Sequence, residues 1–108
     1  MTTPFVNQLR TRKAPIRLAR EGAAAINIRV EMPEVWDTVL IVVSPTESVL
    51  GVKTRALEAL FPQADYHEDF VLKLRGWEIL EEGAALAEVG VVDGSILLLT
   101  HRRRRPVR

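Results

Sequence analysis

Hydrophobic and polar residues alternate strictly along residues 26–32, the first regular pattern in the chain. The apolar positions are Ile26, Ile28, Val30 and Met32, with polar residues between them. This period of two predicts a β-strand with one buried face, because successive side chains of a strand point to opposite sides. Residues 36–43, rich in Val, Ile and Thr, predict a second strand. The short separation of the two segments favours an antiparallel hairpin.

The segment after the hairpin carries the signals of a helix start. Ser44 offers an N-cap hydroxyl, Pro45 suits the first helical position, and Glu47 is placed to close a capping box. The apolar residues that follow are spaced three and four apart, at Val49, Val52, Ala56 and Leu60, with Leu57 beside them. They predict a helix with one buried stripe, which ends before Pro62. Gly51 is expected to weaken this helix by about 1 kcal/mol relative to alanine.

Shorter strands are predicted in the last third of the chain. Residues 70–75 alternate between apolar and other positions, residues 79–80 predict a very short strand, and residues 95–100 predict the last one. Residues 96–99 are all apolar, so both faces of this last strand are apolar. The element order is therefore ββαβ(β)β, which belongs to the α+β class, and the sequence contains no internal repeat.

Charge is distributed unevenly along the chain, although the net charge is only +1. Residues 1–24 carry five basic residues and one acidic residue, residues 101–108 carry five arginines and no acid, and residues 25–100 carry five basic and 13 acidic residues. Residues 1–24 also lack a sustained period. We therefore predict a flexible basic arm at 1–24, a folded domain at 25–100 and a flexible Arg-rich tail at 101–108.

Several classes of function lack support in the composition. The absence of cysteine removes disulfides, thiolate catalysis and cysteine-ligated zinc, and it fits a reducing compartment. No apolar run approaches the roughly 18 residues of a membrane span, and the first residues make a poor secretory signal, so a cytoplasmic location is expected. His67 and His101 have no partner motif, and no glycine-rich phosphate loop is present. We expect no enzyme activity, no cofactor and no bound metal.

Particular stretches of the sequence resemble the ubiquitin-like family. They are the hairpin at 26–43, the helix start at 44–53, and residues 72–98, which contain Leu-Lys-Leu-Arg-Gly, Leu-Glu-Glu-Gly and Asp-Gly-Ser-Ile. The resemblance covers residues 25–100 and implies a β-grasp fold, a mixed sheet wrapped around one helix. Leu80, Leu86 and Val91 are then expected to anchor the irregular segment before the last strand. Trp36 is expected to cover the end of the hairpin.

The sequence departs from the family pattern in one respect that bears on function. Family members that are conjugated end in Gly-Gly, whereas this chain contains no Gly-Gly pair. The resemblance therefore implies a non-conjugating member. Residues 90–99 also resemble the small bacterial ubiquitin-like proteins of type VII secretion systems. This likeness implies an accessory component of a secretion system or another multiprotein system.

The leading hypothesis is a non-enzymatic protein-binding module or adaptor. If Ile96 and Leu98 face the helix, the other face of the sheet presents the candidate partner-binding residues: Lys73, Arg75, Trp77, Leu97 and Leu99. Trp77 falls in a predicted turn, where packing and partner binding are equally open. Auxiliary contacts are expected from the tail residues Arg102, Arg103, Arg104 and Arg105.

The arginine tail has more than one interpretation. It is a solubilising segment, a docking site for an acidic protein, or a site for nucleic acid or an anionic membrane surface. The acidic body and the absence of aromatic residues among the basic runs argue against nucleic acid, because no stacking platform accompanies the charge. An accessory nucleic-acid-binding protein acting through its basic tails is the alternative function. The sequence leaves the partner and the oligomeric state open.

Overall fold

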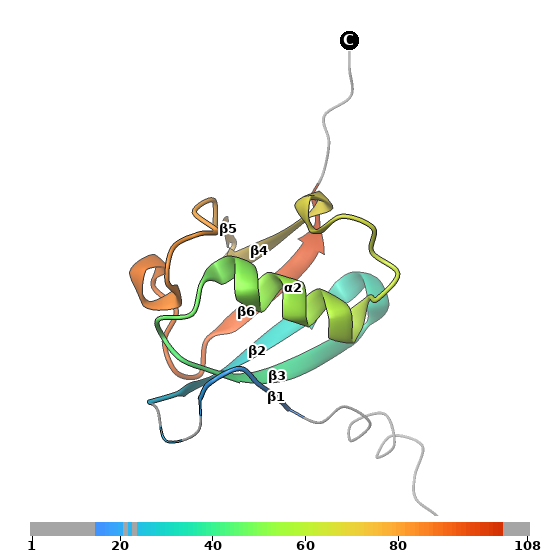
Figure 1. Ribbon diagram of the computed structural model, residues 1–108. Helices are drawn as coiled ribbons and strands as arrows, with labels where there is room; N and C mark the ends of the chain where they lie inside the picture. Colours follow the sequence, from blue (N-terminus) through green and yellow to red (C-terminus); the bar gives the residue numbers. More distant parts are fainter. Residues whose placement is uncertain (1–14, 21, 23, 103–108) are drawn as a thin grey trace, which may run out of the picture.

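The computed structural model describes residues 15–20, 22 and 24–102, which form one mixed sheet with a helix across one face (Figure 1). The strands are β1 (Ile16–Arg17), β2 (Ile26–Met32), β3 (Asp37–Val43), β4 (Phe70–Leu74), β5 (Trp77–Glu78) and β6 (Ile96–His101). The helix is α2 (Val49–Leu60). Short 3₁₀ turns are η1 (Pro33–Val35), η2 (His67–Asp69) and η3 (Leu86–Val89). This arrangement confirms the predicted α+β, β-grasp fold.

The described strands lie side by side in the order β1-β3-β2-β6-β4-β5. β2 and β3 form the predicted antiparallel hairpin, in which Ile26 pairs with Val43 and Met32 pairs with Asp37. β6 lies parallel to β2 at the centre of the sheet, and β4 runs antiparallel to β6. Because α2 crosses one side, the sheet has a covered face toward α2 and an open face away from it (Figure 1).

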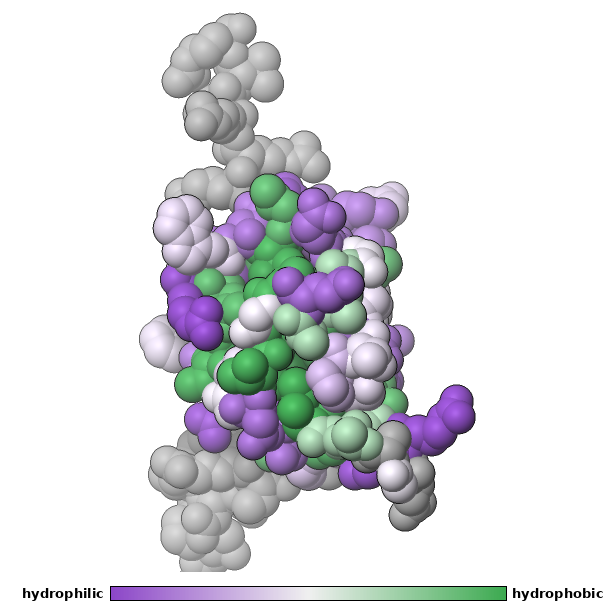
Figure 2. Space-filling model, turned by 90° about the vertical axis from the view of Figure 1, so that its left-hand side faces the viewer, coloured by the Kyte–Doolittle hydropathy of each residue, from purple (hydrophilic) through white to green (hydrophobic). Residues whose placement is uncertain are grey.

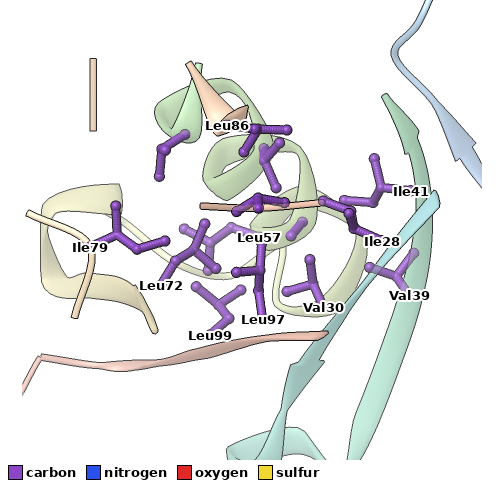
Figure 3. Packing of buried hydrophobic residues seen from close by; sticks show 14 of the residues in the cluster. Ile28, Val30, Val39, Ile41, Leu57, Leu72, Ile79, Leu86, Leu97 and Leu99 are labelled. Carbon is purple, nitrogen blue, oxygen red and sulfur yellow. The ribbon is translucent and has the colours of Figure 1, made fainter. Parts of the chain in front are cut away.

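The hydrophobic core lies between α2 and the covered face (Figure 3). The alternation predicted for β2 is confirmed, since Ile28, Val30 and Met32 are buried while Asn27 and Arg29 are exposed. The apolar stripe of α2 is buried as well: Val49, Val52, Ala56, Leu57 and Leu60. Each large apolar side chain buried in this way contributes about 1.5–3 kcal/mol to stability.

Helix α2 begins later than predicted. Ser48, not Ser44, is the N-cap, and its hydroxyl accepts a hydrogen bond from the Gly51 N–H at 3.0 Å. The Ser44 hydroxyl instead accepts a hydrogen bond from the Thr46 N–H at 3.2 Å, within a turn. The predicted capping box is therefore wrong. Gly51 lies in the first turn of the helix, where its missing side chain leaves room for the Glu47 carboxylate.

Residues before 25 add a strand to the sheet. β1 runs parallel to β3, with Ile16 beside Ile41, and the Leu18 N–H donates to a β3 carbonyl at 2.7 Å. Ile16 and Leu18 also pack against the core. The folded part therefore extends upstream of the predicted boundary at residue 25. Residues 1–14 of the predicted arm lie outside the described residues.

The segment between β4 and β6 differs in detail from the prediction. The short strand occupies Trp77–Glu78 rather than residues 79–80. Ile79 is buried and anchors the segment, whereas Leu80, the predicted anchor, is 77% exposed. Leu86 and Val91 are buried as predicted. The sequence prediction therefore placed the first anchor at Leu80, one residue after the observed anchor, Ile79.

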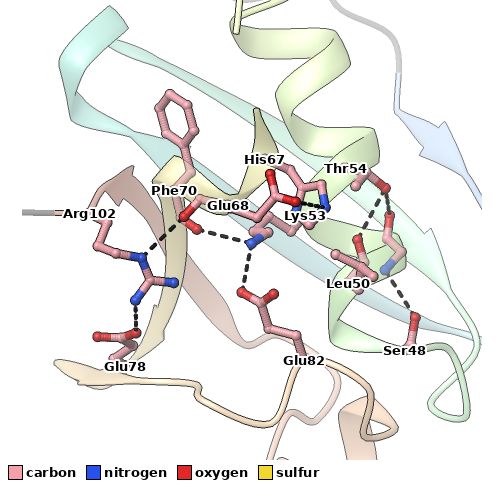
Figure 4. Close-up of polar contacts among 11 residues, drawn as sticks. Ser48, Leu50, Lys53, Thr54, His67, Glu68, Phe70, Glu78, Glu82 and Arg102 are labelled. Carbon is pink, nitrogen blue, oxygen red and sulfur yellow. Dashed lines mark hydrogen bonds and ion pairs between the residues drawn. The ribbon is translucent and has the colours of Figure 1, made fainter. Parts of the chain in front are cut away.

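A buried ion pair fastens this segment to the helix. Lys53 is fully buried, and its ammonium donates to the Glu82 carboxylate at 2.7 Å and to the Phe70 carbonyl at 3.0 Å (Figure 4). A buried charge requires such partners because its desolvation is costly. The contacts join α2, the first residue of β4 and the irregular segment that precedes β6.

Candidate protein-binding face

The open face presents side chains from the central strands in adjacent rows. One row consists of Leu40, Arg29 and Ile96, and the next consists of Glu31, Leu98 and Lys73. Ile96 is 50% exposed, Leu40 is 38% exposed and Leu98 is half-buried. Large apolar side chains thus lie between charged ones, on a surface that no described α-helix covers.

The structure corrects the assignment of Leu97 and Leu99 to the partner-binding face. Both side chains are fully buried on the covered face, as Figure 3 shows. Leu97 pairs with Val30 across β2, and Leu99 pairs with Leu72 across β4. All four belong to the core cluster under α2. Leu97 and Leu99 are therefore core residues, unavailable to a partner in the folded domain.

The error came from the orientation of β6. The prediction that Ile96 and Leu98 face the helix is wrong, because both lie on the open face. An uninterrupted run of apolar residues has no alternation, so it does not fix which side faces the core. Thr100 could have indicated which side of β6 faces solvent. It is a polar residue on the same side of the strand as Leu98 and Ile96, which places that side toward solvent.

The other predicted binding residues lie at different places. Lys73 is on the open face, between Leu98 of β6 and Glu78 of β5. Arg75 is exposed in the turn between β4 and β5, with a positive φ of 53°. Trp77 begins β5 at the edge of the sheet and is 79% exposed, which excludes core packing. Lys73 therefore belongs to the open face, Arg75 lies in the adjoining turn, and Trp77 pairs with Leu74, whose side chain is on the covered face.

The first arginine of the tail is bound to its own domain. The Arg102 guanidinium donates to the Glu78 carboxylate at 3.0 Å and to the Glu68 carbonyl at 3.2 Å (Figure 4). Its backbone N–H donates to the Asp69 carbonyl at 2.6 Å. Arg102 therefore neutralises a β5 carboxylate, and its role as an auxiliary contact stays a prediction. Arg103, Arg104 and Arg105 lie outside the described residues.

The turn between β2 and β3 holds an exposed tryptophan. Trp36 does not cover the hairpin as predicted: it is 93% exposed and has a positive φ of 55°. A bulky residue in the left-handed region is strained, so this conformation costs about 1–3 kcal/mol without burying the side chain. Trp36 is therefore a surface feature that the sequence prediction missed.

Glu34 ties the same turn to the end of β6. Its carboxylate accepts hydrogen bonds from the Thr100 hydroxyl at 2.6 Å and from the His101 N–H at 2.9 Å. Partial burial raises the pKa of Glu34, but these hydrogen bonds outweigh that effect and hold the pKa below its ordinary value. The turn that carries Trp36 is therefore fixed next to Thr100 and His101 at the end of β6.

The histidines make contacts within the domain. His67 Nε2 lies 3.5 Å from the Glu68 carboxylate, and the His101 ring packs edge-on against Phe70 with 5.1 Å between ring centroids. His101 is exposed and His67 is half-buried. In the described part of the chain, no group of three or more His, Cys, Asp or Glu residues is arranged to hold a metal ion. No helix of residues 15–20, 22 and 24–102 is long and apolar enough to cross a membrane.

The mixed sheet, the single described helix and the central parallel pair of β2 and β6 define a β-grasp fold of the ubiquitin-like type. The ubiquitin-like domain of an Arabidopsis thaliana protein matches with a TM-score of 0.63 and 16% identity, over 84% of this chain and 92% of that one. Ubiquitin of Caldiarchaeum subterraneum matches with a TM-score of 0.63 and 18% identity, over 77% of this chain and 100% of that one.

The UBL domain of Plasmodium falciparum Dsk2 matches with a TM-score of 0.61 and 22% identity, over 72% of this chain and 99% of that one. No protein-family model matches the chain, and no curated protein matches it. At these identities the similarity establishes the fold alone. Function must therefore be inferred from the surface of this chain.

Proposed function

We propose that the chain is a non-enzymatic protein-binding module, an adaptor whose open face receives a protein partner. The observation that carries this proposal is the exposure of Leu40 and Ile96 beside Arg29 and Lys73 on one sheet surface. Apolar side chains surrounded by charged ones are typical of protein interfaces, where a few desolvated residues carry most of the affinity. The presence of the same fold in ubiquitin and in ubiquitin-like domains supports it.

A capture experiment with the full-length chain tests this function. The immobilised chain is expected to retain a defined protein from a nuclease-treated lysate of the source cells. The double variant Ile96→Ser/Leu98→Ser should lose that protein, because it removes the apolar centre of the open face. The matched control is Leu80→Ser, which changes an exposed leucine outside the described strands. Equal capture by the double variant and the control contradicts the proposal.

Narrower statements about the role stay predictions. They are that the chain is not conjugated, that it is cytoplasmic, and that it serves as an accessory component in type VII secretion or another multiprotein system. The identity of the captured protein tests the last of these directly. Capture of components unrelated to secretion would remove the secretion hypothesis while leaving the adaptor function in place.

The alternative function, nucleic-acid binding through the basic tails, gains one observation from the structure. Glu34 fixes the turn of Trp36 next to the end of β6, so an exposed aromatic ring lies near the root of the arginine tail. Stacking of a base on such a ring contributes about 1–3 kcal/mol. This function predicts binding to single-stranded oligonucleotides that falls steeply with added salt and weakens in Trp36→Ala. Salt-insensitive binding, or none, removes it.

A further inference from the structure

Two hollows lie at the end of the sheet where β6 begins, and Ile96 lines both of them. The smaller hollow, of about 200 Å³, is also lined by Arg29 and Leu40. The larger one, of about 450 Å³, is also lined by Arg75 and Val92. Ile96 is 50% exposed and Val92 is 57% exposed. Exposed aliphatic side chains beside hollows are typical of a binding site, and Figure 2, which views the molecule from this end, shows hydrophobic residues between hydrophilic ones.

The unpaired basic residues of the acidic domain gather around these hollows. Residues 25–100 carry five basic and 13 acidic residues. Lys53 is buried in an ion pair, and Arg55 is paired with a neighbouring glutamate on α2 at 2.7 Å. The other three basic residues have no ion pair within the described part of the chain, and they are Arg29, Lys73 and Arg75. Since Arg29 and Lys73 lie on the open face and Arg75 in the adjoining turn, this surface is the basic region of an acidic domain.

The acidic side chains beside the hollows are fewer than the basic ones. Asp93 lines the larger hollow, where its carboxylate accepts a hydrogen bond from the Asn27 N–H at 2.7 Å. Glu31 lies in the next row of the sheet. Glu78 of β5 is neutralised by the Arg102 guanidinium at 3.0 Å. The region therefore keeps an excess of positive charge, whereas the domain as a whole is negative.

We infer that the open face receives an acidic segment of its partner protein, with apolar side chains in the hollows on both sides of Ile96 and carboxylates against Arg29 and Arg75. This inference rests on the proposed function and names the chemistry of the partner. An arginine guanidinium binds a carboxylate through two parallel hydrogen bonds, so each hollow offers an apolar surface and one oriented cation.

Nucleic acid also carries negative charge, but it fits these hollows less well. Single-stranded bases bind by stacking on aromatic side chains. None of the described residues that line either hollow is aromatic, and Ile96, Leu40 and Val92 are aliphatic. The hollows therefore favour aliphatic side chains of a peptide over bases.

Selection from a phage-displayed library of random dodecapeptides tests the inference, with the full-length chain immobilised. The enriched peptides are expected to carry Asp or Glu next to Leu, Ile, Val or Phe. Fluorescence anisotropy then measures the binding of an enriched peptide, which should weaken as salt is added, because the charges that attract it are exposed. Enrichment of basic or uncharged peptides, or no enrichment at all, overturns the inference.

Charge reversal establishes where the enriched peptide binds. Arg29→Glu and Arg75→Glu should each weaken binding about tenfold, and the double variant about 100-fold, because each replaces an attracting charge with a repelling one. The matched control is Arg55→Glu, which makes the same charge change on α2, away from the open face, and should alter binding less than about twofold. Circular dichroism establishes that each variant is folded. Peptides that bind the double variant as well as the control are held by the basic tails or another surface, and this result also overturns the inference.

The same variants separate this inference from the proposed function. A lysate protein that is lost by Ile96→Ser/Leu98→Ser but retained by Arg29→Glu/Arg75→Glu would overturn the acidic partner and leave the adaptor function in place. Capture that Ile96→Ser/Leu98→Ser does not change contradicts the adaptor function itself. A single-stranded oligonucleotide that binds the wild type and is lost by Arg29→Glu/Arg75→Glu would assign the basic region to nucleic acid and overturn the inference.

Discussion

Strand β6 contributes Leu97 and Leu99 to the covered face of the sheet, and Ile96 and Leu98 to the open face. The four side chains have nearly the same size and hydrophobicity. The first pair is fully buried under α2, whereas Ile96 is half exposed and Leu98 is half-buried. Composition therefore does not decide which residues stabilise the fold and which remain available for binding. The role of each residue depends on whether its side chain lies on the face covered by α2 or on the open face.

The charges of the two faces differ in the same way. Lys53 on the covered side is fully buried and bound to Glu82 and to a backbone carbonyl. Arg29 and Lys73 on the open side keep contact with solvent. A charge under the helix must have partners to exist there, whereas a charge on the open face is free to meet a partner protein. The covered side therefore holds a charge that stabilises the fold, and the open side holds the charges that we propose contact a partner.

The largest expected effect is the difference in stability between serine substitutions on the two faces of β6. Leu97→Ser or Leu99→Ser should lower the free energy of unfolding by more than about 4 kcal/mol, through a cavity and a buried hydroxyl. Against a total of about 5–15 kcal/mol, either change is expected to leave much of the protein unfolded. Leu98→Ser, one residue away, should cost less than about 1.5 kcal/mol. Urea denaturation followed by circular dichroism measures all three, and equal losses would contradict the assignment of the faces.

Most of the fold followed from local patterns that report directly on physical constraints. The alternation in residues 26–32 and the spacing of the apolar residues after Val49 located β2, β3 and α2, because burial on one side imposes those periods. The helix start was wrong because Ser44 and Ser48 are both capable caps. The choice between them depends on where the turn after β3 places the chain. That is a tertiary constraint that a local signal does not contain.

The candidate site was less predictable than the fold. The sequence left packing and partner binding equally open for Trp77, and it did not fix the orientation of β6, because residues 96–99 are uniformly apolar. Trp36 was expected to pack, since an aromatic residue at a turn usually finds a surface to cover. Its position in the left-handed region turns it outward, and no residue type signals that geometry.

The next effect concerns the charge beneath the helix. Glu82→Ala should lower the free energy of unfolding by about 3 kcal/mol, because it leaves the buried Lys53 ammonium with the Phe70 carbonyl as its only described partner. Glu82→Gln should cost less, since its carbonyl still accepts a hydrogen bond. Glu31→Ala removes a charge from the open face and should change stability by less than about 0.5 kcal/mol. Thermal unfolding compares the three variants. Equal effects of Glu82→Ala and Glu31→Ala would contradict the proposed difference between the charges of the covered side and those of the open face.

A smaller effect is expected at the exposed tryptophan outside both faces. Trp36→Gly should make the domain more stable than Trp36→Ala by about 1 kcal/mol, because glycine adopts the φ of 55° without strain. Both variants remove the indole ring, but only alanine keeps the backbone strain. The difference in stability between the two variants therefore measures the strain. A denaturant midpoint for each variant measures the difference. If Trp36→Ala is instead the more stable variant, the left-handed backbone conformation at residue 36 does not destabilise the domain.

The smallest effect links the end of β6 to pH. The pKa of Glu34 is lowered in the folded state from its ordinary value of 4.5, so the charged carboxylate stabilises the fold above that value. This contribution is lost as the pH falls through the acid range and the folded protein takes up the proton. The stability difference between the wild type and Glu34→Gln should therefore shrink as the pH is lowered below 4.5. Thr100→Val removes one donor to the carboxylate and should move the pKa of Glu34 upward in an NMR titration. An unchanged titration in that variant would show that the Thr100 hydroxyl does not hold the carboxylate in its charged form.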